Sequence, residues 1–127
     1  MADIHIAMAN TVANSNIYPI FIPSKNREDG KTFNLLKDLD CNKYIIVEPQ
    51  DFEKYQKYTD NFEIIKIDKN NQGLPYARNF LKKFVETKYE WFWQIDDDIS
   101  QFFETKNNKN VKISPEIALD KAQDLFK

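Results

Sequence analysis

Apolar residues are concentrated in short runs along this chain, and polar segments separate the runs. The apolar runs are Ile17–Ile22, Tyr44–Val47, Phe62–Ile67 and Trp91–Ile95. Apolar stretches of about four to eight residues, bounded by turn-forming residues, are typical of strands that are buried on both faces of a sheet. The pattern therefore predicts four buried strands.

The segments between the predicted strands carry apolar residues at helical spacing. Thr32 is predicted to cap the first helix, and Asp51 to cap a short second helix that ends at Tyr58. A turn at residues 70–73 precedes a third helix that runs to about residue 86, with Pro75 in its first turn. Strands that alternate with helices predict an α/β fold, in which a mostly parallel sheet has helices on both faces.

The remaining segments predict how the chain is organised. Residues 1–16 are predicted to form a flexible leader, and residues 17–127 a single domain. The polar stretch Glu104–Lys112 is rich in Lys and Asn, and within it we expect residues 106–112 to form a solvated loop rather than a surface that contacts a polyanion. Ser114 and Pro115 are predicted to open a final helix.

Scarce residue types exclude several classes of enzyme. The two glycines, Gly30 and Gly73, lie too far apart for a P-loop or a GxGxxG loop. Cys41 is the only cysteine, which excludes an internal disulfide and a cysteine-based zinc cluster. The only histidine, His5, lies in the predicted leader, which argues against Ser-His-Asp or Cys-His catalysis. Any chemistry is therefore expected from carboxylates, hydroxyls, lysines, arginines or a bound metal.

Charge and hydropathy limit which partners and which cellular compartment are expected. No apolar run approaches the roughly 20 residues of a membrane-spanning helix, and residues 1–16 lack the pattern of a signal peptide. The net charge is −2 and the lysines are dispersed, so the sequence has no basic footprint for nucleic acid. We therefore expect a soluble, cytoplasmic protein without a membrane partner.

Polar residues follow every predicted strand. Because the carboxyl ends of parallel strands share one edge of a sheet, where ligands bind, these residues are expected to form one site. The candidates, in chain order, are Pro23, Ser24, Arg27, Glu48, Arg78, Asp96, Asp97 and Asp98.

The three consecutive aspartates are the sharpest feature of this set. On an extended chain Asp96 and Asp98 share one face, and Asp97 points away. Two carboxylates on one side suit Mg²⁺ or Mn²⁺, which complete their coordination with water and ligand phosphates. The alternative is a solvated acidic turn.

The other candidates also have a ligand-binding and a purely structural interpretation. Arg27 and Arg78 are the only arginines beside sixteen lysines, and a guanidinium group matches a phosphate or a base edge as an ammonium group cannot. Their alternatives are a surface ion pair for Arg27 and an exposed helix position for Arg78. Glu48 could accept from a base N–H group, or be a charged residue at a strand end.

Four segments together resemble the nucleotide-sugar half of a GT-A glycosyltransferase, and in particular the phage-type TET-associated glycosyltransferases. The segments are IYPIFIPSKNR, YIIVEP, IIKIDKNNQGLPYARNF and WFWQIDDDI, and the resemblance covers roughly residues 17–104. It implies a Rossmann-like GT-A core, a UDP-sugar as donor, Mn²⁺ or Mg²⁺ as cofactor, and a bacterial cell or phage-infected host. Some members of that branch glycosylate hydroxymethylated bases in DNA. A complete GT-A enzyme continues well beyond its DxD strand, so the resemblance implies a truncated, donor-binding half without a catalytic base.

The resemblance also implies roles for single residues. Asp98 would hold the metal that bridges the diphosphate, with Asp96 near the metal and the ribose. Asp97 is counted with them in the nucleotide-sugar site. Pro23, Ser24 and Arg27 would line the nucleotide pocket. Glu48 would approach the base, and Arg78 would lie on the ribose-phosphate side.

Three other functions stay open at the level of sequence. The first is a catalytically incomplete module that binds a nucleotide without turnover. The second is a haloacid-dehalogenase-like phosphohydrolase, because residues 96–100 approximate a DxDx[TV] loop, although that loop normally follows the first strand. The third is a scaffold without a ligand. A homo-oligomer could bury an exposed sheet edge.

Overall fold

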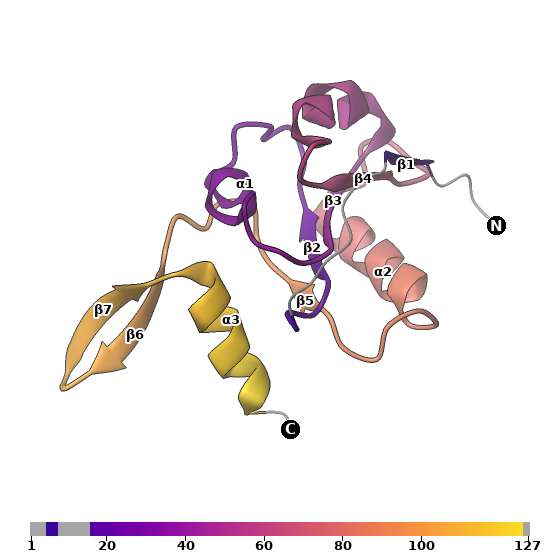
Figure 1. The fold of residues 1–127 in the computed structure, drawn as a ribbon. Helices are drawn as coiled ribbons and strands as arrows, with labels where there is room; N and C mark the ends of the chain where they lie inside the picture. The colour runs from indigo at the N-terminus through magenta and orange to yellow at the C-terminus, as the bar shows by residue number, and fades with distance from the viewer. Residues whose placement is uncertain (1–4, 8–15, 126–127) are drawn as a thin grey trace.

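The computed structural model of the chain describes residues 5–7 and 16–125 (Figure 1). Parallel strands and helices alternate through most of the chain, as the sequence predicts. The elements are β1 His5–Ala7, β2 Ile20–Pro23, α1 Lys31–Leu36, β3 Lys43–Val47, the 3₁₀ helix η1 Pro49–Tyr58, β4 Glu63–Lys66, α2 Gly73–Val85, β5 Trp93–Gln94, β6 Phe102–Lys106, β7 Lys109–Ile113 and α3 Pro115–Asp124.

The main sheet has the strand order β1-β4-β3-β2-β5. The neighbours β4–β3, β3–β2 and β2–β5 are parallel, which confirms the predicted parallel sheet, and β1 adds an antiparallel edge beside β4. The chain moves outward from β2 through β3 to β4, and then α2 returns it to the opposite side of β2 as β5. The strand order therefore reverses between β2 and β5, and a crevice at this point is where open α/β sheets bind ligands.

Helices cover both faces of the sheet, as predicted. On one face, Phe33 and Leu36 of α1 and Tyr55 of η1 pack in a buried cluster. On the other face, Leu81 and Val85 of α2 pack in a second buried cluster. Because both faces are covered, β2 and β3 are buried along their whole length.

Two predicted helix caps are wrong. The residue before α1 is Gly30, and the hydroxyl of Thr32 instead donates to the Asp96 carbonyl (2.5 Å) and accepts from the Ile99 amide (2.8 Å). Asp51 lies inside the first turn of η1, and its carboxylate accepts from the amide of Asn26 (2.8 Å). In both cases a partner that is distant in the sequence replaces the local amide of a helix start.

The predicted solvated loop at residues 106–112 is also wrong. This segment forms the turn and most of the second strand of a two-stranded antiparallel hairpin, β6–β7, which projects away from the main sheet (Figure 1). Asn107 and Asn108 connect the strands, and both have positive φ angles, 51° and 61°. Asn tolerates this left-handed conformation, and two such residues match the turn that suits the twist of a hairpin.

Other predictions at the ends of the chain have mixed outcomes. The final helix begins as predicted, since the Ser114 hydroxyl accepts from the amide of Ile117 and Pro115 occupies the first turn. Within the predicted leader, residues 5–7 form β1, and residues 1–4 and 8–15 lie outside the described part of the chain. None of the described helices has the length and apolar character needed to cross a bilayer.

Candidate functional site

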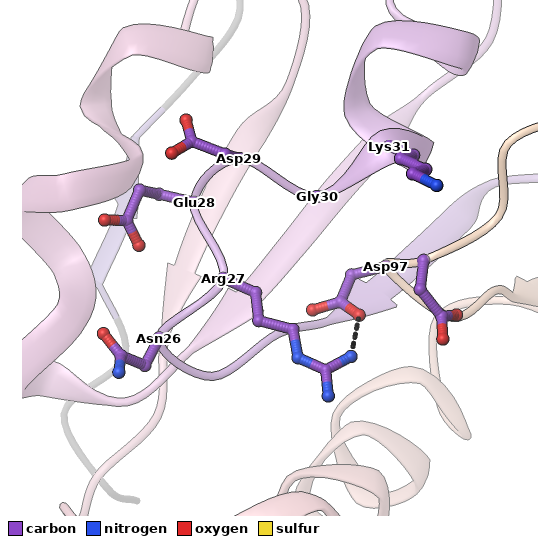
Figure 2. Close-up of a pocket in the computed structure, with 8 residues that line it drawn as sticks. Asn26, Arg27, Glu28, Asp29, Gly30, Lys31 and Asp97 are labelled. Atoms are coloured by element: carbon purple, nitrogen blue, oxygen red, sulfur yellow. Dashed lines mark hydrogen bonds and ion pairs between the residues drawn. The ribbon is translucent and has the colours of Figure 1, made fainter.

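A pocket of about 580 Å³ opens at the point where the strand order reverses. Residues 26–31, which connect β2 to α1, form one wall, and Asp97 and Asp98, which follow β5, form the other (Figure 2). This volume lies within the range of roughly 300–1,000 Å³ that is typical of small-molecule sites. The pocket therefore lies where the sheet topology and the predicted residues both place a ligand.

A chain of buried hydrogen bonds runs behind the pocket. The Ser24 hydroxyl donates to Oδ2 of Asp97 (2.6 Å), so its single proton is used there. The Tyr55 hydroxyl, 2.7 Å from Ser24 Oγ, must then be the donor in that contact. Its oxygen in turn accepts from the backbone amide of Arg27 (2.9 Å). The four groups therefore form one directed series from Arg27 to Asp97.

The protonation of Tyr55 agrees with this direction. Its side chain is fully buried, and burial is the main cause that raises the pKa of its hydroxyl above the ordinary value. The hydrogen bonds with Ser24 and the Arg27 amide act in the opposite sense and are smaller. The phenol therefore stays protonated at neutral pH and keeps its role as a donor.

The same hydrogen-bond series positions Arg27 beside the pocket. Nη1 of Arg27 lies 3.4 Å from Oδ1 of Asp97, while the Arg27 side chain is 63% exposed (Figure 2). The buried Asp97 carboxylate is thus compensated by one hydroxyl and one guanidinium group, as a buried charge requires. Since the guanidinium group has five N–H donors, most of them remain available to an anion in the pocket.

Gly30 allows the two walls of the pocket to approach closely. A Cβ atom at this position would lie 2.5 Å from the Asp97 carbonyl oxygen, a distance that real Cβ atoms essentially never show. The Thr32 amide donates to the same carbonyl oxygen (3.3 Å). The β2–α1 loop and the aspartate turn are therefore held against each other by backbone contacts that only glycine permits.

The three aspartates have different surroundings. Asp96 and Asp98 are exposed and Asp97 is buried, which is the alternation predicted for this segment. However, the pocket wall contains Asp97 and Asp98, and Asp96 instead lies 3.5 Å from Nη2 of Arg78. Arg78 lines a separate pocket along α2. The structure therefore groups Arg27 with Asp97 and Asp98, and Arg78 with Asp96.

A divalent cation fits this donor set if the ligand supplies part of its shell. Within residues 5–7 and 16–125, no group of three or more His, Cys, Asp or Glu side chains is suited to a metal ion. Both oxygens of Asp97 have partners, and Asp98 is exposed at the pocket wall. Mg²⁺ commonly takes only one or two carboxylates and completes its shell with water and substrate phosphates.

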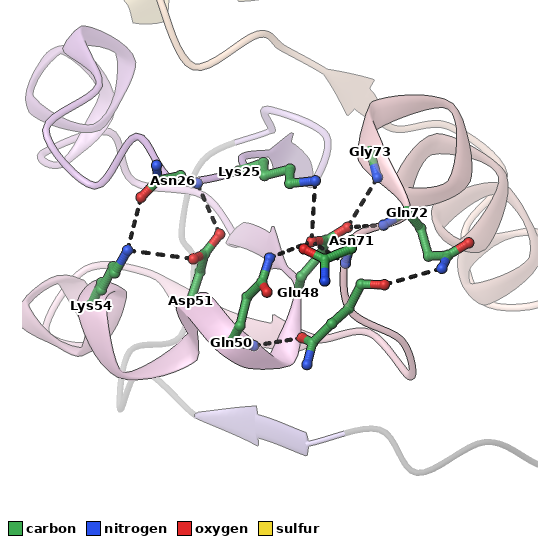
Figure 3. Close-up of polar contacts among 10 residues, drawn as sticks. Lys25, Asn26, Glu48, Gln50, Asp51, Lys54, Asn71, Gln72 and Gly73 are labelled. Atoms are coloured by element: carbon green, nitrogen blue, oxygen red, sulfur yellow. Dashed lines mark hydrogen bonds and ion pairs between the residues drawn. The ribbon is translucent and has the colours of Figure 1, made fainter.

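Glu48, predicted to approach a base, is buried and holds the start of α2 (Figure 3). One carboxylate oxygen accepts from the amide of Asn71 (2.8 Å), and the other from the amides of Gln72 (2.7 Å) and Gly73 (3.0 Å). Lys25 lies 3.6 Å away. Burial raises the pKa of Glu48, but these amides and the Lys25 ammonium together outweigh it and hold the pKa below its ordinary value.

A second buried carboxylate orients the loop that carries Arg27. Asn26 adopts a left-handed conformation with a φ angle of 52°, and its amide donates to Asp51 of η1. Its side-chain oxygen accepts from Lys54 (2.8 Å), which also lies 3.6 Å from Asp51 (Figure 3). The strained residue before Arg27 is therefore fixed from two sides.

Three of the eight predicted site residues, Arg27, Asp97 and Asp98, line the pocket. Ser24 belongs to the hydrogen-bond series behind it, and Pro23, Glu48, Arg78 and Asp96 lie outside its lining. Tyr55 and Gly30 are not among the predicted site residues. The scarcity of glycine was a usable signal for Gly30, whereas the position of the Tyr55 hydroxyl depends on how η1 packs on the sheet.

Comparison with known proteins adds one finding. A family model described as TET-Associated Glycosyltransferase matches residues 18–127. The match spans every parallel strand, both walls of the pocket, the β6–β7 hairpin and α3. No curated protein and no solved structure is significantly similar to the chain.

Proposed function

The chain belongs to the TET-associated glycosyltransferase family, and on that premise we propose that it binds a nucleoside-diphosphate sugar in the pocket between β2 and β5. The observation that supports this is the buried series that holds Asp97 and Arg27 at the reversal of strand order. Since the matching family is one of glycosyltransferases, the phosphohydrolase alternative loses its support.

We infer that two cations contact the diphosphate, in a pocket whose lining also holds the carboxylates of Glu28, Asp29, Asp97 and Asp98. Arg27 presents an exposed guanidinium group, whose fork of donors matches phosphate oxygens. Lys31 lines the same pocket and adds a second positive charge. These groups stabilise the negative charge that develops on the nucleoside diphosphate as the bond to the sugar breaks.

We propose that Asp98 is the protein ligand of a Mg²⁺ or Mn²⁺ ion shared with the diphosphate. The ion would supply Lewis-acid stabilisation of the departing phosphate oxygens. Asp97 supports this arrangement from the buried side, where Ser24 and Arg27 restrain its carboxylate. A direct metal bond from Asp96 stays a prediction, and would compete with the ion pair to Arg78.

The acceptor is proposed to be a modified base in DNA. This part rests on the resemblance to phage-type members of the family, and UDP is proposed as the nucleotide on the same basis. A catalytic base is not assigned to any residue of this chain.

Calorimetric titration tests the nucleotide site. UDP is titrated into wild type, Asp98→Asn and Asp60→Asn, each with and without Mn²⁺; Asp60 is an exposed aspartate outside the pocket and serves as the matched control. We expect metal-dependent binding that is lost in Asp98→Asn and retained in Asp60→Asn. If UDP does not bind, the other nucleoside diphosphates are titrated, and failure of all of them would refute the site.

Turnover separates the transferase from a binding module. Release of sugar from the nucleotide donor that binds is measured with and without hydroxymethylated DNA. Donor hydrolysis or transfer by wild type supports the enzyme. Binding without either reaction supports the catalytically incomplete module.

A further inference from the structure

The β6–β7 hairpin has one packed face and one open face. The strand register sets Phe103 opposite Lys112, and Thr105 opposite Asn110. Residues that face each other, and residues two apart on one strand, share a face of the ribbon. These four residues therefore form one surface, which we call the outer face.

The other face of the hairpin is turned toward the body of the protein. Phe102 packs against the buried cluster beneath α1, and Glu104 accepts from Lys121 of α3 (2.6 Å). Because neighbouring residues on a strand point to opposite faces, Phe103 is directed away from these contacts. Phe103 is 59% exposed on this projecting ribbon (Figure 1).

Positive charge on the hairpin is only partly balanced. The register sets Lys106 directly opposite Lys109 beside the turn, an arrangement of like charges that destabilises a ribbon. Lys106 lies 3.6 Å from Glu104. Among the described residues, no carboxylate lies within ion-pair distance of Lys109 or Lys112. The hairpin is thus a cationic element in a chain whose net charge is −2, and it complements an anionic partner.

The hairpin is also continuous with the proposed nucleotide site. A second pocket of about 610 Å³ shares residues 29–31 with the site pocket. Its far wall contains Ser100 and Gln101, the residues that lead directly into β6. A partner that lies along the hairpin would therefore be next to a pocket that adjoins the proposed nucleotide site.

We propose that the β6–β7 hairpin binds the acceptor as a DNA strand on its outer face, with an unstacked base on Phe103 and a phosphate near Lys112, which the register sets opposite Phe103. Aromatic side chains flanked by cations are the general means by which proteins bind single strands, because every base has a face that can stack. The inference rests on the proposed function in one respect, that the bound strand is the acceptor.

Fluorescence anisotropy with a labelled single-stranded DNA of mixed sequence tests the proposal. Phe103→Ala is expected to weaken binding about tenfold, the effect of losing one stacked base. Lys112→Glu is compared with Lys83→Glu, which changes the same charge at an exposed lysine of α2. We expect only Lys112→Glu to weaken binding and to reduce the dependence of log K on log salt, by about 0.7 for one phosphate contact.

Three results would overturn the proposal. The first is equal loss of binding in Lys112→Glu and Lys83→Glu, which would indicate net charge alone. The second is unchanged binding in Phe103→Ala. The third is a change in oligomeric state of the hairpin variants in light scattering, which would assign the outer face to contact between copies of the chain. Circular dichroism establishes that each variant is folded.

The nucleotide titration keeps this inference separate from the proposed function. Hairpin variants that bind the nucleoside diphosphate normally but lose DNA support the hairpin surface. If wild type binds DNA through the hairpin but binds no nucleotide, the proposed nucleotide site is refuted and the proposed hairpin surface is supported. Nucleotide binding without DNA binding refutes the hairpin surface alone.

Discussion

Removal of the Tyr55 hydroxyl isolates the buried series that supports the pocket. In Tyr55→Phe, Ser24 still donates to Asp97, but the amide of Arg27 loses its acceptor. At this partly buried contact, an N–H group without a partner costs about 1–3 kcal/mol. Since the side chain loses only one oxygen atom, no large cavity forms, and this cost is the expected loss in the free energy of unfolding.

Urea denaturation measures that loss. We expect the free energy of unfolding of Tyr55→Phe to fall by about 1–3 kcal/mol with an unchanged m-value. The melting temperature should then fall by about 4 °C per kcal/mol for a domain of this size. Tyr76→Phe is the matched control, because its hydroxyl donates to Asp68 in an exposed position (2.6 Å), where the cost is expected to be below about 0.5 kcal/mol.

The site gives a second measurement on the same variant. Because Tyr55 orients the Arg27 amide, Tyr55→Phe should also weaken binding of the nucleoside diphosphate, whereas Tyr76→Phe should not. Equal unfolding free energies for the two variants and wild type would refute the argument, since they would mean that the Arg27 amide does not depend on Tyr55.

Three further predictions concern a contact of the pocket, the start of α2 and the turn of the hairpin. Gly30→Ala places a Cβ atom against the Asp97 carbonyl, so we expect about 1–3 kcal/mol of destabilisation by urea denaturation and weaker nucleotide binding in calorimetry. Glu48→Gln cannot accept from all of its amide partners, and should lose about 1–3 kcal/mol at neutral pH. The pKa of Glu48 is lowered in the folded state, so its contribution is present above its ordinary pKa and is lost as pH falls through the folded value. The difference in stability between wild type and Glu48→Gln should therefore narrow below about pH 4.5, and a constant difference down to pH 2 would contradict this. Asn108→Val forces a β-branched residue into a positive φ angle, and should loosen the hairpin, seen as faster amide hydrogen exchange in β6 and β7 with the main sheet unchanged.

Local patterns were sufficient for most of the architecture. Three of the four apolar runs form the strands β2, β3 and β4 with buried residues, whereas the prediction of a buried strand at residues 91–95 is wrong, because only the two-residue β5 forms there and it is not buried. The alternation with helices then leaves few arrangements, because crossover connections between parallel strands are right-handed. The residues that follow the strands, such as Ser24 and Asp97, had to meet at one edge of the sheet for the same reason.

The sequence also contains a signal for the hairpin, but it lies in the turn residues and not in the composition. The composition of residues 104–112 is polar, and this suggested a loop. The pair Asn107–Asn108 between two segments of equal length was the better indicator, because both residues tolerate positive φ angles. A ribbon that exposes one face needs few apolar residues, so composition alone could not distinguish it from a loop.

The sequence by itself determined which residues follow the parallel strands at one edge of the sheet. The tertiary structure alone decided which of them line the pocket and which partner each one takes. Glu48 follows a strand as predicted, yet its carboxylate turns to three amides at the start of α2. Tyr55 enters the site because η1 packs over β2 and brings its hydroxyl to Ser24, 31 positions away. The physical reason is that a buried polar group must find a partner, and the partner within reach depends on how distant segments pack.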